Sequence, residues 1–243
     1  MKVTSKLIGL SALALTVALC GCGEVGIPVI SSAMRNAETT TMAMNGRKLI
    51  QGIIQANIER FDKGPVWPRT YREGDSDGKD ISEKSFKSAA EYFNVLFDMA
   101  HYGTSEWKPI VDRDLLSTLG KNAVVDGKIN PAGLDWCIAA NVMDETQDFI
   151  PVLVSANVNP ALLPCNQFDG VDDRQLPIGP KSGAAKSMFG DSAVVLVRKS
   201  SAAETFKEKY FRLNLVLQNQ AFDDSAREHK IVWLTPTGIA ECK

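Results

Sequence analysis

The sequence predicts an α+β fold in which one long N-terminal α-helix packs on a small antiparallel β-sheet. The first observation is a stripe of apolar residues that recurs mostly at steps of three and four, as on one face of a helix. Its members are Ile30, Ala33, Ala37, Met44, Leu49, Ile53, Ala56 and Phe61. The second observation is a set of short, apolar, largely β-branched runs that predict strands, at 136–140, 149–155, 193–198 and 231–234.

The long helix is predicted to run, with a kink at Pro28, from near Lys6 to about Asp62. Gly64-Pro65 then forms a helix stop. A second helix is predicted from Phe86 to Gly103, and a short one over 114–119. The segment 205–218 fits a helix or a strand, and 157–185 is a long excursion rich in Pro, Gly, Asp and Asn.

The N-terminal segment is apolar and follows two lysines. No charged residue lies between Lys6 and Glu24, so this stretch predicts a membrane helix. Its large apolar residues are Leu7, Leu10, Leu13, Leu15, Val17 and Leu19. We therefore divide the chain into a hydrophobic membrane segment, 1–34, and a body, 35–243, which includes the second half of the long helix.

Two other interpretations of the same segment stay open. Leu19-Cys20-Gly21-Cys22 resembles a bacterial lipobox, in which Cys22 would become the lipid-modified N-terminus of a periplasmic lipoprotein. That protein would act as a binding or interaction module. A plain secretory signal cut near Gly21 or Gly23 is the second alternative.

The layout resembles the type IV pilin-like proteins, specifically the pseudopilins of type II secretion-like systems. The residues that carry the resemblance are Pro28, the segment Asn45-Gly46-Arg47-Lys48-Leu49, and Asp62-Lys63-Gly64 followed by Pro65 and Pro68. "SKLIGLSALAL" departs from the family, because it lacks the Gly-Phe processing junction and has Ser11 where the family carries Glu.

This resemblance implies a non-enzymatic structural subunit with a pilin-like fold. The subunit would cross the bacterial inner membrane once, with its body facing the periplasm. Its partners would be the membrane and other pilin-like subunits, bound through the N-terminal helix.

The sequence offers little for catalysis or for nucleic acid. A net charge of −2 gives no basic surface for nucleic acid, and two histidines with no nucleophile motif predict neither catalytic residues nor a small-molecule substrate. A secreted hydrolase is the least favoured reading for this reason. Asp75, Asp77 and Asp80 are weak calcium candidates, and a solvated turn is the favoured explanation of these residues. No other cofactor is predicted.

Three cysteines lie in the body: Cys137, Cys165 and Cys242. They allow one disulfide with one thiol left over, and the sequence does not choose among the three pairings.

Overall fold

The structure is a computed structural model of the chain. It describes residues 26–70, 80–104, 108–144, 146, 148, 150–157, 175–177, 194–206, 210–212 and 231–240. The chain forms two compact units, Met1–Glu38 and Thr39–Lys243, and the boundary between them falls inside one helix. The molecule combines helices with antiparallel sheets, as expected of the α+β class.

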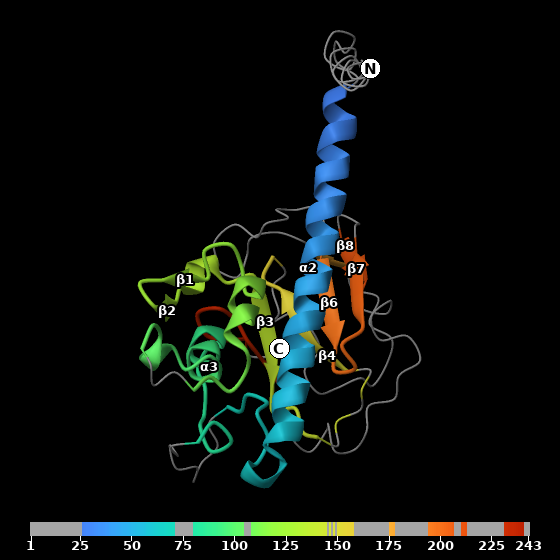
Figure 1. The fold of residues 1–243 in the computed structure, drawn as a ribbon. Helices are drawn as coiled ribbons and strands as arrows, with labels where there is room; N and C mark the ends of the chain where they lie inside the picture. The colour runs from blue at the N-terminus through green and yellow to red at the C-terminus, as the bar shows by residue number, and fades with distance from the viewer. Residues whose placement is uncertain are drawn as a thin grey trace, which may run out of the picture. The chain divides into compact units, whose positions relative to one another are not determined.

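The long helix α2 (Gly26–Glu59) has 34 residues and opens the described part of the chain (Figure 1). The prediction of unbroken helix between residues 30 and 59 is confirmed. A 3-10 turn, η1 (Phe61–Lys63), follows, and Gly64 then adopts φ +88°, which favours glycine. The predicted start near Lys6 lies outside the described residues.

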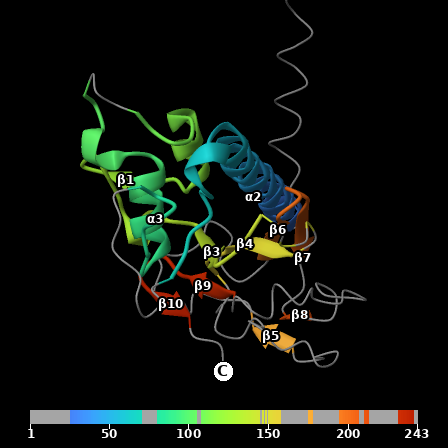
Figure 2. The ribbon, with the colours of Figure 1, turned by 90° about the horizontal axis from the view of Figure 1, so that it is seen from below.

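A six-stranded antiparallel sheet forms the centre of the second unit, in the order β10-β9-β3-β4-β6-β7 (Figures 1 and 2). Its strands are β3 (Trp136–Ala140), β4 (Pro151–Ser155), β6 (Val194–Arg198), β7 (Ala203–Phe206), β9 (Val232–Leu234) and β10 (Ile239–Ala240). The four predicted strands are confirmed as β3, β4, β6 and β9. Every position of β3 and β4 is buried, so both faces of the sheet are covered there.

Two further strands form a separate ribbon. β5 (Gln175–Pro177), inside the predicted excursion, pairs with β8 (Tyr210–Arg212), inside the ambiguous segment 205–218. The described positions of that segment are therefore strand, and the rest lies outside the described residues.

The second helix is shorter than predicted. Ser88 caps the N-terminus of α3 (Ala89–Leu96), because its side chain accepts a hydrogen bond from the backbone N–H of Glu91 at 3.1 Å. It ends before Asp98, which has φ +47° and so cannot continue the helix. The remaining short elements are η2 (Met99–His101), η3 (Arg113–Thr118), β1 (Val124–Val125), β2 (Lys128–Ile129) and η4 (Pro131–Gly133).

The inner face of α2, which packs in the core, consists of Met42, Gly46, Leu49, Ile50, Ile53 and Ala56. Burial of Leu49, Ile53 and Ala56 was predicted and is confirmed. The prediction that Phe61 packs on the sheet was wrong, because Phe61 is 89% exposed. Met44, which belongs to the apolar stripe in the sequence, is also exposed, at 52%. At 100° per residue Met44 lies on the opposite side of the helix from Met42, and Phe61 comes after α2 has ended.

Candidate functional site

The inner face of α2 makes a close contact with the sheet. A Cβ on Gly46 would lie 2.7 Å from Cγ2 of Val197 in β6 and 2.8 Å from Cη2 of Trp136 in β3. The Trp136 ring is held in place because its Nε1 donates a 2.9 Å hydrogen bond to the carbonyl oxygen of Thr118. The helix backbone therefore rests directly on two strands, and only a glycine at position 46 permits this distance.

The outer face of α2 is exposed along the same stretch. It consists of Met44, Arg47, Lys48, Gln51, Gln55, Ile58 and Glu59. Together with Phe61, Met44 and Ile58 make up half of the large apolar side chains that are exposed in the described part of the chain. Its two basic residues, Arg47 and Lys48, lie near its start, and its one acidic residue, Glu59, lies at its end. Met44 and Ile58 lie fourteen residues apart on this face, and the exposed side chains between them are polar or charged.

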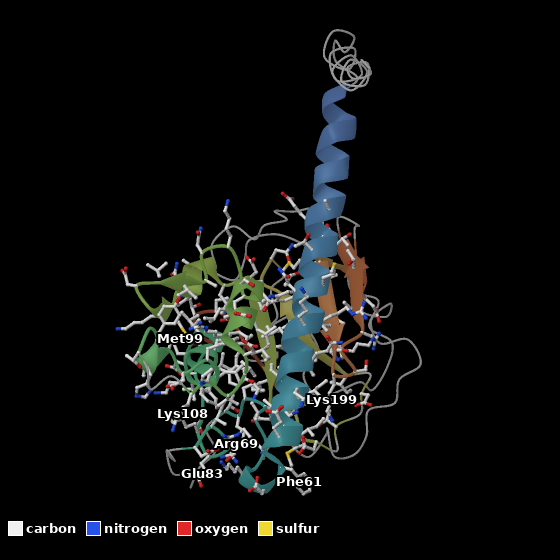
Figure 3. All side chains as sticks on the ribbon, in the orientation of Figure 1. Phe61, Arg69, Glu83, Met99, Lys108 and Lys199 are labelled. Carbon is white, nitrogen blue, oxygen red and sulfur yellow. The ribbon has the colours of Figure 1, made fainter. Side chains whose placement is uncertain are left out.

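Polar side chains fix the chain where α2 ends. Oδ1 of Asn57 accepts a 2.6 Å hydrogen bond from the backbone N–H of Val66. Nη2 of Arg60 donates to both carboxylate oxygens of Asp80, at 2.8 and 2.6 Å. Phe61, the residue after Arg60, is labelled at the lower end of α2 in Figure 3. Ser82 donates to the same carboxylate through its backbone N–H and its hydroxyl. Burial raises the pKa of Asp80, but these hydrogen bonds outweigh it and hold the pKa below the usual value.

Asp80 is thus engaged in a structural contact with Arg60 and Ser82. The other calcium candidates, Asp75 and Asp77, lie outside the described residues. In the described part of the chain no three His, Cys, Asp or Glu residues come together in a group that could hold a metal ion.

The predicted membrane and lipid residues also lie outside the described residues. They are Leu7, Leu10, Leu13, Leu15, Val17, Leu19 and Cys22. Within the described ranges, no helix has both the length and the apolar character needed to cross a bilayer.

Cys137 is a free thiol that is fully buried in β3. Burial raises its pKa well above the usual range, so the thiol is unreactive in the folded chain. Of the three disulfide pairings, only Cys165 with Cys242 stays open, and both residues lie outside the described part.

Sequence reasoning did not single out Asp135, which directly precedes β3. Burial raises the pKa of its carboxyl to about 6, and no described residue donates a hydrogen bond to its carboxylate. Oδ2 lies 3.0 Å from the place where a Cβ of Gly120 would be. No sequence motif marks Asp135, because its burial comes from backbone segments that meet only in the fold.

A buried lysine, Lys199, and a surface hollow are two further candidate features, and neither offers a reactive site. The amine of Lys199, a buried residue that Figure 3 labels, donates to the carbonyl oxygens of Asp144 and Thr146 at 2.5 Å each, which ties the β6–β7 turn to the loop between β3 and β4. A shallow surface hollow of about 550 Å³ has no nucleophile paired with a base among its lining residues. These residues are Tyr102, Gly103, Arg113, Asp114, Leu116 and Ser117.

Comparison with known proteins gave no relative for this chain. No protein-family model matches it, and neither a curated protein nor a solved structure does so.

Proposed function

We propose that this chain is a non-enzymatic structural subunit of a type II secretion or type IV pilus-like assembly. Its N-terminal helix holds it in the bacterial inner membrane, and its body faces the periplasm. Its partners are other pilin-like subunits, which it meets through that helix.

The observation that carries the proposal is the construction of α2. This 34-residue helix follows the charge-free N-terminal stretch, and its second half is fixed on an antiparallel sheet through Gly46 and the buried Leu49 and Ile53. A helix of this kind is what a membrane helix that continues into a folded body would require. The exit at Gly64 and Pro65 agrees with the segment that resembles the pilin-like proteins.

The physics of the N-terminal segment supports a membrane helix. From Leu7 to Glu24 the helix would extend ~25 Å along its axis, which places Glu24 near the far side of a ~30 Å hydrocarbon core. A carboxylate costs little at that interface, and Lys2 and Lys6 stay on the cytoplasmic side. Small residues that permit close helix packing in lipid are frequent in the segment: Gly9, Ser11, Ala12, Ala14, Ala18 and Gly21.

The alternative is a periplasmic lipoprotein anchored at Cys22, which the lipobox-like Leu19-Cys20-Gly21-Cys22 favours. Mass spectrometry of the mature N-terminus and membrane fractionation of Cys22→Ala separate the two. We expect Cys22→Ala to stay in the membrane fraction at full length. Release of this variant as a soluble periplasmic protein, or a diacylglyceryl group on Cys22 of the unsubstituted chain, would contradict the pilin-like proposal.

The proposal also predicts that the full-length chain turns over no ester, peptide, glycoside or phosphate reporter. Reproducible turnover that one substitution abolishes would contradict it.

A further inference from the structure

Four buried polar side-chain atoms have no hydrogen-bond partner in the described part of the chain, and all four lie between residues 60 and 85. They are Nε of Arg60, Nε1 of Trp67, Nε of Arg69 and Oγ of Ser85. Three are N–H groups and the fourth is a hydroxyl, so each of them can donate a hydrogen bond. A buried donor without a partner destabilises a fold, and in native proteins such a group commonly meets an ordered water or a bound ion.

Two of these donors, Arg69 and Ser85, lie where two segments of the chain meet. The carbonyl oxygen of Arg69 accepts a 2.8 Å hydrogen bond from the backbone N–H of Phe86. Nη2 of Arg69 reaches the carbonyl oxygen of Glu83 at 3.5 Å, and Figure 3 labels both residues. The side chain of Arg69 therefore follows residues 83–86, and Ser85 lies between its two contacts. This places Nε of Arg69 and Oγ of Ser85 in one small region.

Arg69 also carries a charge that no described carboxylate balances. Within the described ranges, no Asp or Glu side chain forms an ion pair with Arg69. Arg60 differs in this respect, because both carboxylate oxygens of Asp80 accept from its Nη2. Burial of part of a guanidinium is unfavourable when no opposite charge replaces the lost water. The charge of Arg69 therefore favours a negatively charged acceptor over a neutral one.

The backbone on both sides of Arg69 is fixed by Asn141. The backbone N–H of Asn141 donates to the carbonyl oxygen of Pro68 at 2.8 Å, and its Oδ1 accepts from the backbone N–H of Thr70 at 3.0 Å. Binding at Arg69 therefore requires little ordering of the chain, which favours affinity.

We propose that Arg69 and Ser85 bind a phosphate group. Nε of Arg69 and Oγ of Ser85 donate to its oxygens, and the guanidinium supplies the opposite charge. This site goes beyond the proposed function, because it does not depend on how the N-terminal segment is anchored.

Two other occupants are compatible with the same donors. An ordered water would satisfy both donors but would leave the charge of Arg69 without a counter-charge. A carboxylate of the chain itself is the second alternative, because Glu73, Asp75 and Asp77 follow Arg69 closely in sequence and lie outside the described residues. Both alternatives predict that added phosphate does not stabilise the chain.

Thermal unfolding of the purified full-length chain in detergent tests the site. Inorganic phosphate replaces chloride at constant ionic strength, and we expect the Tm to rise with the phosphate concentration. Arg69→Gln should abolish this rise. The matched control Arg47→Gln removes the same charge from the exposed face of α2 and should keep it. No rise in the unsubstituted chain, a rise retained in Arg69→Gln, or a rise lost in Arg47→Gln would overturn the proposal.

Ser85→Ala removes only a hydroxyl and tests the site even if Arg69→Gln does not fold. In calorimetric titration with inorganic phosphate we expect its Kd to be about tenfold higher than that of the unsubstituted chain, as for the loss of one hydrogen bond to a charged group. Ser117→Ala, at an exposed hydroxyl of η3, should leave the Kd unchanged. Equal Kd values for Ser85→Ala and the unsubstituted chain would contradict the assignment. Glycerol phosphate in place of inorganic phosphate distinguishes the sources: binding of both identifies a phosphate group of a larger molecule, and binding of inorganic phosphate alone identifies the free anion.

The variant Glu73→Gln/Asp75→Asn/Asp77→Asn tests the chain's own carboxylates as the occupant. We expect its Tm to rise with phosphate as much as that of the unsubstituted chain. If phosphate raises the Tm of this variant alone, a carboxylate of the chain fills the site, and the proposal is overturned.

Discussion

Substitution of Gly46 by alanine should weaken the contact between α2 and the sheet. The new methyl group would lie 2.7 Å from Val197 and 2.8 Å from Trp136, about 1 Å inside ordinary carbon–carbon contact. Neither neighbour can move easily. Val197 is β-branched and fully buried, and the Trp136 ring is held by its hydrogen bond to Thr118.

The expected magnitude follows from two opposing effects. Overpacking of a core costs ~1–3 kcal/mol, whereas replacing a helical glycine by alanine gains ~1 kcal/mol. The net loss in the free energy of unfolding for Gly46→Ala should therefore be up to ~2 kcal/mol. For a unit of this size that is a decrease in Tm of up to about 8 °C, measurable by thermal denaturation followed by circular dichroism.

Gly52→Ala is the matched control, with the same substitution six residues later in the same helix. Its Cβ would meet only the side chain of Leu115, with Cδ1 at 2.3 Å and Cγ at 3.8 Å, and Cδ1 is the end of a flexible, partly buried side chain. Leu115 can turn aside, so the helix-propensity gain should leave this variant as stable as the unsubstituted chain or up to ~1 kcal/mol more stable. If Gly46→Ala proves as stable as Gly52→Ala, close packing on Trp136 and Val197 is not the reason for glycine at position 46.

Three further substitutions or treatments give sharp outcomes. Ile53→Asp buries a carboxylate in the core and should lower the free energy of unfolding by ~4 kcal/mol or more. Phe61→Asp, at an exposed site, should change it by less than ~0.5 kcal/mol. Denaturant titration measures both values. The pKa of Asp135 is about 6 when folded against 3.8 for an unperturbed carboxyl, so the folded chain binds the proton more tightly and gains stability as pH falls from about 6 to 4. Above pH 6 Asp135→Asn should therefore be more stable than the unsubstituted chain by up to ~3 kcal/mol, and this advantage should vanish near pH 4; a pH-independent difference would refute the assignment. Cys137 should react with a thiol reagent only on unfolding, so labelling of Cys137 in the native chain, located by mass spectrometry, would contradict its burial.

The elements with a clear period could be predicted from the sequence. The strands β3, β4, β6 and β9 follow from β-branched content, with ends correct to within two residues. The helix through residues 30–59 follows from apolar spacing, although it was predicted to reach Asp62 and ends at Glu59. The prediction of which helix residues are buried was less accurate. The apolar residues around Met44 are seven and five residues apart, so the predicted face turns around the helix axis there. Burial at Met42 and Ile50 shows where the face lies.

Features that depend on contacts between distant segments could not be predicted. The raised pKa of Asp135 comes from its burial in the fold, where Gly120 lies close to it, and the role of Asp80 depends on Arg60, twenty residues away. The β1–β2 hairpin has a local sequence signal, the pair Asp126-Gly127. Both residues adopt positive φ, as in the Asp-Gly turns of tight hairpins.

The two faces of α2 should respond differently to mutation, because one is buried in the fold and the other is exposed. Ile53→Val removes one buried methyl group and should lower the free energy of unfolding by ~0.5–1.5 kcal/mol. Lys48→Asp changes an exposed side chain on the opposite face and should change the free energy of unfolding by less than ~0.5 kcal/mol. Denaturant titration of both variants measures the difference. If Lys48→Asp destabilises the chain as much as Ile53→Val does, the outer face contributes to the fold and is not a free surface of the helix.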